Sequence, residues 1–247
     1  MNVKLISVTQ PQVKGYDDKL MSAESIIAYC ARVSNPKNQH NVKTAPKLLK
    51  FLIKHKHWSP FELANMCVEI KTSRAIAAQI LRHRSFSFQE FSQRYSEATD
   101  IEPLELRSPA EKNRQSSSEA FAKGNAVYEL ANKTMERSMK AYDDLIKSGV
   151  AKECARAVLP LGTQTTMYMN GTVRSWIHYI NLRTEENTQK EHRNIANAIK
   201  NIFIKQFPNV SEALEWSHHH WSKKELEEMG WDYFHQCHLK PDESAHE

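Results

Sequence analysis

Glycine is scarce in this 247-residue chain. The chain has six glycines, whereas an average usage of about 7% would give about 17. The closest two, Gly162 and Gly171, are still separated by eight other residues. This spacing excludes both the G-x-G-x-x-G turn of a Rossmann fold and the glycine-rich P-loop. Any nucleotide or phosphate that the chain binds must therefore be held by side chains.

Signals for export and for a membrane span are also lacking. No apolar run approaches the roughly 18 residues of a membrane span, and residues 1–8 have the pattern of a short strand rather than of a signal peptide. The cysteines Cys30, Cys67, Cys154 and Cys237 are scattered without a C-x-x-C pair, so they suggest neither a disulfide framework nor a zinc ribbon. We expect a cytoplasmic protein with reduced thiols and no membrane partner.

The charge balance is mildly basic. Lysine and arginine number 34 against 29 aspartates and glutamates, a formal net charge of +5, and 12 histidines could add charge in acid. A surplus of this size suits anionic ligands but does not say where the charge lies. The chain length is near the upper limit for one hydrophobic core, so we expect a single domain.

Capping residues and helical spacing predict that most of the chain is helical. Ser59 is a candidate N-cap, Thr188 and Glu191 form a candidate capping box, and Gly149 and Pro208 mark two helix ends. The expected helices span residues 22–30, 44–54, a short turn from 59, 73–83, 127–147, a short one before 160, 172–182, 188–207 and 222–230.

Three segments have the alternation of a strand with one buried face. Residues 66–70 and 165–169 are expected to be inner strands, and residues 1–8 a third strand. The polar stretch 108–118 shows no such pattern. The chain is therefore expected to have an α+β fold, a helix-rich single domain with a small antiparallel or mixed sheet.

The densest run of polar side chains is the segment 79–95. In the helix expected from Ser73, Gln79, Arg82 and His83 are spaced i, i+3 and i+4 and so would share one face. Beyond that helix, polar and aromatic residues are interleaved: Arg84, Glu90, Ser92 and Arg94 among Phe86, Phe88, Phe91 and Tyr95. Guanidinium groups bind phosphate bidentately and aromatic rings stack on heterocycles. The segment therefore predicts a nucleotide site that needs no glycine.

Two other interpretations of this segment remain open. Residues 82–84 could simply place cations at a helix C-terminus, and basic residues among aromatics also describe a single-strand nucleic-acid binder. Acidic residues between Glu90 and Glu105 dilute the charge. This favours a pocket over a nucleic-acid track, so no nucleic-acid partner is expected.

The same segment resembles the signature of the flavin-dependent thymidylate synthases (the ThyX family). The signature residues are Arg82-His83-Arg84 and, after seven intervening residues, Ser92-x-Arg94-Tyr95, with Glu90 two before the serine. Further matches follow in order: Ala31-Arg32-Val33-Ser34, His57-x-Ser59-Pro60-Phe61-Glu62, Cys154-Ala155-Arg156, Leu159-Pro160-Leu161, Arg174-Ser175, Asn181-Leu182-Arg183 and Gln189-x-Glu191. The resemblance covers about residues 2–216 and weakens over 97–118.

Members of that family convert dUMP to dTMP with methylenetetrahydrofolate as carbon donor, bound FAD as hydride carrier and NADPH as reductant. They are homotetramers whose active sites lie between subunits. The resemblance therefore implies an FAD-dependent methyltransferase of dTMP biosynthesis, with dUMP, folate, NADPH and other copies of the chain as partners. The alternative is an inactive family member that acts as a nucleic-acid-binding or regulatory protein.

The resemblance also assigns site residues. Those implied to bind dUMP are Gln79, Arg82, Glu90, Ser92, Gln93, Arg94, Arg156 and Arg183. Those implied to bind FAD are Ser59, Arg82, His83, Arg84, Glu90, Arg174, His178 and Leu182.

Arg183, Ser92 and His57 are the implied catalytic residues. Arg183 would lie against the uracil ring and stabilise ionised N3, which suits a fixed cation. We prefer Ser92 as a phosphate ligand, because the sequence places no His or Lys to activate it as a nucleophile. His57 occupies a position associated with the folate and flavin side of the site. No cysteine has the cationic setting of a reactive thiolate, which agrees with a flavin route.

A few residues depart from the family pattern or have ordinary explanations. His178 and Thr172 stand where Asn is typical and Asn187 where His is common, which puts FAD contacts there in question. Taken alone, His178 would be a core or interface histidine. Arg156 would lie on a solvated helix face and Arg183 would complement a helix dipole.

Residues 217–247 are expected to be a C-terminal helical extension of the domain formed by residues 1–216. The extension is rich in histidine (His218–His220, His235 and His238, with Cys237), but the spacing is not that of zinc ligands, so no metal is expected. Ser222 and Glu225 are spaced as a helix cap. We expect the extension to pack on a neighbouring subunit.

Overall fold

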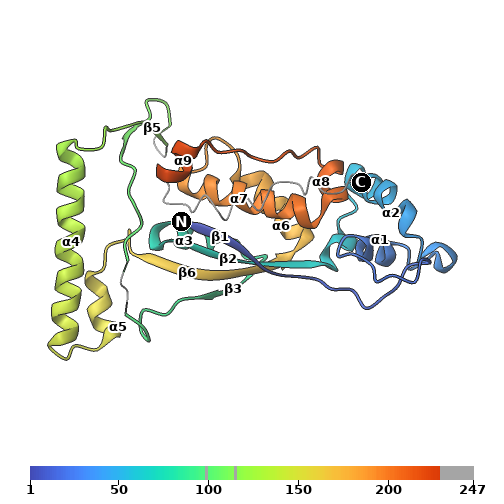
Figure 1. The fold of residues 1–247 in the computed structure, drawn as a ribbon, viewed down its shortest axis with the longest axis horizontal. Coiled ribbons are helices and arrows are strands. Elements are labelled where there is room, and N and C mark those ends of the chain that lie inside the picture. Colours follow the sequence, from blue (N-terminus) through green and yellow to red (C-terminus); the bar gives the residue numbers. More distant parts are fainter. Residues whose placement is uncertain (98–99, 114–115, 229–247) are drawn as a thin grey trace.

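The protein is built around a four-stranded antiparallel sheet (Figure 1). The computed structural model describes residues 1–97, 100–113 and 116–228. The strand order is β1 (Asn2–Val8), β2 (Asn65–Ser73), β6 (Gln164–Thr172) and β3 (Ser87–Glu90). Each neighbouring pair is antiparallel. The expected helix-rich α+β fold with a small sheet is thus confirmed.

The core lies on one face of this sheet because β2 and β6 alternate in step. Val68 pairs with Met169 and Ile70 with Met167, and all four side chains have no exposed surface. Their face packs against α3 (Arg74–Ile80), α6 (Val173–Arg183) and α7 (Lys190–Gln206) in one cluster of buried residues. Figure 1 shows α6 and α7 side by side along the sheet.

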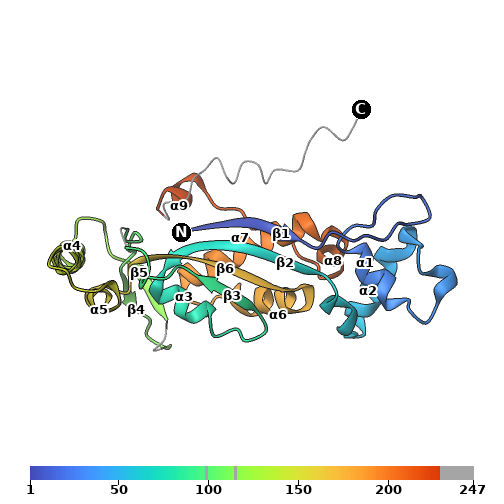
Figure 2. The same ribbon diagram turned by 90° about the horizontal axis from the view of Figure 1, so that it is seen from below.

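Most of the remaining elements gather at the two ends of the sheet (Figure 2). At one end lie α1 (Ser25–Ala31), α2 (Ala45–Lys54), α8 (Pro208–Ala213) and the 3-10 turns η1 (Pro36–Asn38), η2 (Val42–Thr44) and η3 (Ser59–Glu62). At the other end lie the hairpin of β4 (Arg107–Pro109) and β5 (Ser117–Ala120), α4 (Ala126–Lys147), α5 (Lys152–Ala155) and the turn η4 (Arg156–Val158). No helix in the described part of the chain is long and apolar enough to cross a membrane.

Several expected helix boundaries are confirmed by their capping contacts. Ser73 Oγ accepts a hydrogen bond from Ile76 N at 3.4 Å, and Thr172 Oγ1 accepts one from Ser175 N at 3.2 Å. Gly149 follows α4 with φ of +86°, a conformation that glycine adopts without strain.

The helix after Ser73 is shorter than expected. It ends at Ile80 rather than near His83, and the chain continues in turns in which His83 N donates to Ile80 O at 3.0 Å. The turns bring Phe86 into the core, with its ring centroid 4.6 Å from that of Trp176. A Cβ added to Gly171 would lie 2.4 Å from this ring, so the close approach requires glycine. Gln79, Arg82 and His83 therefore do not share one helix face.

Two expected caps are wrong. Helix α7 begins at Lys190 with Gln189 as its N-cap, because the Thr188 hydroxyl instead donates to Leu182 O at 3.4 Å. Ser59 is the first residue of η3, whose N-cap is Trp58 and has no side-chain capping bond. In addition, the polar stretch 108–118 takes part in the β4–β5 hairpin, which its sequence pattern did not indicate.

The first part of the C-terminal extension packs on the domain. Asn201 Nδ2 of α7 donates to His219 O and Asn201 Oδ1 accepts from His219 N, both at 2.8 Å. Ser222 and Glu225 make the expected cap at the start of α9 (Lys223–Glu228), with Glu225 N donating to Ser222 Oγ at 3.3 Å.

Other expectations for this tail lie beyond what the structure describes. They concern the end of the last helix near residue 230 and the residues His235, Cys237 and His238. Within residues 1–97, 100–113 and 116–228, no three His, Cys, Asp or Glu side chains are grouped as metal ligands. The division at residue 216 and the packing of the tail on a neighbouring subunit stay predictions.

Candidate active site

Arg183 and His83 meet although they are 100 positions apart. Arg183 is the last residue of α6 and His83 follows α3, and Arg183 Nε donates to His83 Nε2 at 2.9 Å. Burial, followed by the charges of Arg183, His178 and Arg82, lowers the pKa of His83 to about 4. The ring is therefore neutral near pH 7 and accepts the hydrogen bond. A neutral partner leaves the positive charge of the guanidinium available to a ligand.

A second polar chain begins beside this pair and was not predicted from the sequence. His192, in the first turn of α7, is fully buried. Its Nε2 lies 3.0 Å from the Tyr179 hydroxyl and its Nδ1 3.3 Å from Gln79 Oε1. Gln79 Nε2 in turn donates to Gln189 Oε1 at 2.7 Å. The Gln189-x-Glu191 motif was the only sequence signal near His192.

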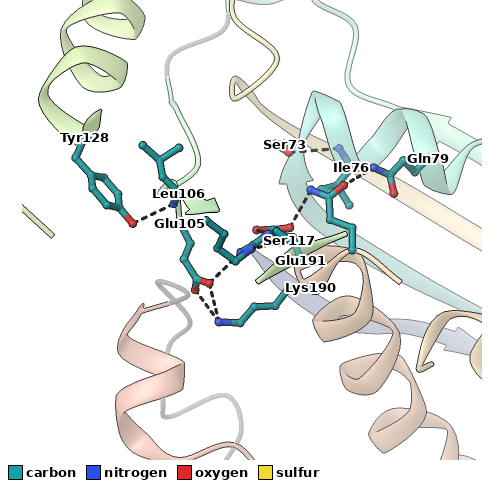
Figure 3. A network of polar contacts seen from close by, with 11 residues as sticks. Ser73, Ile76, Gln79, Glu105, Leu106, Ser117, Tyr128, Lys190 and Glu191 are labelled. Carbon is teal, nitrogen blue, oxygen red and sulfur yellow. Dashed lines mark hydrogen bonds and ion pairs between the residues drawn. The ribbon is translucent and has the colours of Figure 1, made fainter. Parts of the chain in front are cut away.

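The chain of contacts continues to an ion-pair network that ties the β4–β5 hairpin to α7 (Figure 3). Arg107 donates to Glu191 Oε1 at 2.7 Å and to Glu105 Oε1 at 2.9 Å, and Lys190 Nζ lies 2.7 Å from Glu105 Oε2. Burial raises the pKa of Glu105, but hydrogen bonds from Lys190 and Arg107 outweigh it, so its pKa lies below its ordinary value. Only 10% of the Arg107 side chain is exposed, whereas Lys190 is 38% exposed, so the network is partly buried with Arg107 at its inner side.

Glu90 is held at the end of β3 by two side chains. Arg74, the first residue of α3, forms an ion pair with its carboxylate, and Thr165 Oγ1 donates to Glu90 Oε1 at 3.0 Å. The carboxylate is thus fixed in position before any ligand binds.

The expected phosphate ligands come together at the α5 end of the sheet. Arg94 donates to Glu153 Oε2 at 3.1 Å, and Arg156 Nε donates to Glu153 O at 3.3 Å. A cavity of about 420 Å³ is lined by Ser92, Arg94, Tyr95, Ala151, Lys152 and Glu153. Two exposed guanidinium groups beside an open cavity can receive a phosphate.

The surroundings of Ser92 and Gln93 bear on the roles expected for these two residues. Lys152 lies in the same cavity as Ser92, but its ammonium is 3.3 Å from Glu97 Oε1. The Lys152 ammonium is therefore paired with a carboxylate and is not placed as a partner that would activate Ser92. Gln93 is only 7% exposed, and its Nε2 lacks a hydrogen-bond partner in the described part of the chain. An unpaired buried amide is available to a ligand.

A larger cavity of about 540 Å³ opens beside α6, between this helix and η3. It is lined by Trp58, Glu62, Ser85, Arg174, Ser175, Ile177, His178 and Asn181. Arg174 forms an ion pair with Glu62, and Ser175 Oγ donates to Ser85 O at 3.2 Å. The lining offers an indole face, apolar surface and a guanidinium, which together suit a planar ring with polar substituents.

The other predicted residues lie on the surface near these cavities. The exposed side chains are those of His57, Ser59, Arg82, Arg84 and Leu182. Of the predicted dUMP and FAD residues in the described part of the chain, Ser92 and Arg94 line one of these two cavities and Arg174 and His178 the other, so they are divided between separate places around the sheet.

The described cysteines have no activated setting. Burial raises the pKa of Cys30 and of Cys67, which disfavours a thiolate at either position. Cys154 is exposed because α5 is a single turn on the surface, although the sequence of its segment suggests an apolar, buried setting.

Comparisons with known proteins identify the family. The family model "Thymidylate synthase complementing protein" matches residues 18–209. A "Probable flavin-dependent thymidylate synthase" of Paramecium bursaria Chlorella virus 1 is 53% identical over 87% of this chain and 100% of its own length. A "Flavin-dependent thymidylate synthase" of Synechocystis sp. is 51% identical over the same shares.

The fold is also similar to that of a solved structure. A UMP/dUMP methylase, PolB from Streptomyces cacaoi, superposes with a TM-score of 0.72 at 24% identity, covering 87% of this chain and 94% of that one. By sequence, this chain belongs to the flavin-dependent thymidylate synthase family.

Proposed function

We propose that this chain is an FAD-dependent thymidylate synthase that methylates dUMP to dTMP, with methylenetetrahydrofolate as carbon donor and NADPH as reductant. The observation that carries the proposal is the Arg183–His83 pair, a guanidinium held by a neutral ring at 2.9 Å. Family membership supplies the reaction class, and this pair supplies a fixed cation for the charge that develops on the pyrimidine.

The dUMP phosphate is received by Arg94 and Arg156, with Ser92 as a hydroxyl donor. Support comes from the cavity that residues 92–95 share with α5 and from the exposure of both guanidinium groups. Arg94 exchanges its 3.1 Å contact with Glu153 for the more highly charged phosphate. Gln79, Arg82, Glu90 and Gln93 complete the nucleotide site.

FAD is held by Arg174 and His178 in the cavity beside α6, with Ser59, His83, Arg84 and Leu182 at its margins. The indole of Trp58 and the Arg174 guanidinium in the lining fit a flavin ring and an anionic group, respectively. When bound, FAD supplies the hydride that completes the methyl group. His178 lines the cavity, so the replacement of the usual Asn leaves a side chain there that can still donate a hydrogen bond. His57, exposed beside η3, faces the folate side.

The active site is completed between subunits of a homotetramer. The division of the predicted residues among separate places around the sheet supports this. So does the exposure of apolar side chains on and near α4, where Leu130 is 69% exposed and Phe121 39% exposed.

The proposal is tested with the purified protein and FAD. We expect bound flavin to give the absorbance of the oxidised cofactor, and dTMP to form only when dUMP, methylenetetrahydrofolate and NADPH are all present. Omission of each component in turn is the control. Flavin binding without dTMP formation, or affinity for single-stranded nucleic acid in its place, would overturn the enzymatic assignment.

A further inference from the structure

His192 is a buried polar residue to which the proposed function gives no role. It has no exposed surface, and both ring nitrogens are engaged, Nε2 by the Tyr179 hydroxyl at 3.0 Å and Nδ1 by Gln79 Oε1 at 3.3 Å. Buried polar groups that are fully satisfied fix the geometry of their partners. The partner that reaches the surface is Gln79, which is partly exposed.

The direction of each hydrogen bond in the series from Glu191 to Tyr179 follows from the charge on Glu191. Arg107 donates to Glu191 Oε1 at 2.7 Å, so the carboxylate is ion-paired and acts only as an acceptor. Gln189 Nε2 therefore donates to Glu191 Oε2, at 2.9 Å. Gln189 Oε1 is left to accept from Gln79 Nε2, at 2.7 Å.

The remaining protons are then determined. Because Gln79 Nε2 donates to Gln189, Gln79 Oε1 faces His192. This oxygen must accept a hydrogen bond from the Nδ1–H of His192. The bare Nε2 of His192 accepts from the Tyr179 hydroxyl, which keeps its proton because burial raises its pKa. Burial, followed by the charge of Arg183, lowers the pKa of His192 to about 3, so the ring is neutral and carries the single proton that this arrangement needs.

We propose that His192 is a positioning residue for nucleotide binding: by donating to Gln79 Oε1, it fixes the amide so that Gln79 turns an N–H donor toward the nucleotide. One N–H of Gln79 is used on Gln189, and the second is free for the ligand. The complementary atom of the nucleotide is an acceptor oxygen. This inference rests on the proposed function, which places Gln79 at dUMP.

A matched pair of variants isolates the Nδ1–H donor. Leucine and asparagine have nearly the same shape, and both remove the ring contact with Tyr179, but only asparagine can donate from near the Nδ1 position. For the flavin-loaded enzyme, we expect His192→Leu to raise the Kd for dUMP about tenfold and His192→Asn to stay within about threefold of the unchanged protein. Turnover at saturating dUMP should change less than about twofold in both.

A double-mutant cycle tests whether the effect passes through Gln79. In a Gln79→Ala background, the two His192 variants should bind dUMP equally, because the oriented amide is gone. Equal affinity of the two variants when Gln79 is intact would overturn the proposal, as would a difference that persists without Gln79. Failure of the unchanged protein to bind dUMP would refute the proposed function instead.

Tyr179→Phe provides a second route if His192→Leu does not fold. It keeps the ring of residue 179 and removes the proton donor to His192 Nε2, so the histidine can move its own proton from Nδ1 to Nε2. We expect the affinity for dUMP to fall severalfold. Unchanged affinity in this variant would contradict the orienting role.

Discussion

Arg183 Nε lies 2.9 Å from His83 Nε2, so the cation at the end of α6 is oriented by an uncharged acceptor rather than by a carboxylate. A carboxylate partner would neutralise much of the field that Arg183 exerts on a ligand. A neutral imidazole fixes the guanidinium and leaves its charge intact. This arrangement suits a residue that stabilises negative charge in a transition state.

Arg183→Ala should therefore lower turnover more than it lowers affinity. The loss of one preorganised donor at a developing charge costs about 100-fold or more in kcat, whereas the KM for dUMP should change far less. Steady-state kinetics with dUMP as the varied substrate make the comparison. Lys50→Ala, which removes a cation from the exposed surface of α2, is the control and should behave like the unchanged protein. If KM for dUMP rose about 100-fold and kcat did not fall, Arg183 would be assigned to substrate binding alone.

Glu153→Gln should tighten dUMP binding, because Glu153 occupies Arg94 at 3.1 Å in the unliganded chain. Arg94→Ala should do the opposite and lose a charged hydrogen bond that contributes about 1.5–3 kcal/mol. Calorimetric titration with dUMP measures both changes. Weaker binding by Glu153→Gln would show that the carboxylate assists the nucleotide and does not compete with it.

The buried histidines predict a loss of stability in acid. The pKa of His192 is about 3 in the folded chain and 6.5 in its ordinary state, so the unfolded chain binds more protons between these values. The free energy of unfolding therefore falls as the pH decreases from 6.5 towards 3, by about 2 kcal/mol for this residue between about pH 7 and pH 5.

Urea unfolding at fixed protein concentration measures this slope. His192→Asn has no titrating group at this position, so its stability should depend less steeply on pH than that of the unchanged protein. His83 acts in the same direction, with a pKa of about 4, and should account for part of the remaining slope. Parallel pH profiles for the two proteins would contradict the neutral state of His192.

Arg107→Ala should destabilise the fold by about 3 kcal/mol, because it leaves the carboxylates of Glu105 and Glu191 partly buried and without this partner. The exposed pair of Lys133 and Glu129 is the internal comparison, with side chains 66% and 65% exposed. Lys133→Ala should change stability by less than about 1 kcal/mol. Thermal unfolding of the two variants distinguishes the partly buried network from the surface pair; equal losses of stability would mean that solvent screens both.

Local signals allowed much of the fold to be predicted. The hydroxyl caps at Ser73 and Thr172 act within three residues of their partners, and the alternation of Met66, Val68 and Ile70 reflects burial on one face. The β4–β5 hairpin was not predicted, because its strands are short and polar and its sequence lacks an apolar alternation.

The contacts between residues of the candidate site could not be predicted from the sequence. The motif marked His83 and Arg183 separately, but their contact depends on how α3 and α6 are placed on the sheet. His192 carried no motif of its own, and its importance depends on Tyr179 and Gln79, which lie 13 and 113 positions away. Long-range contacts of this kind follow from tertiary packing.

The pairing register of β2 and β6 relates the two elements that supply His83 and Arg183. Each strand has nine residues, Ser73 pairs with Gln164 and Asn65 with Thr172, and each strand leads directly into a helix that starts from a hydroxyl cap. The two paired strands are therefore related by an approximate local twofold axis through the middle of the pair, which exchanges the Ser73 and Thr172 caps. Each strand–helix unit supplies one member of the His83–Arg183 pair, Arg183 as the last residue of α6 and His83 three residues beyond α3.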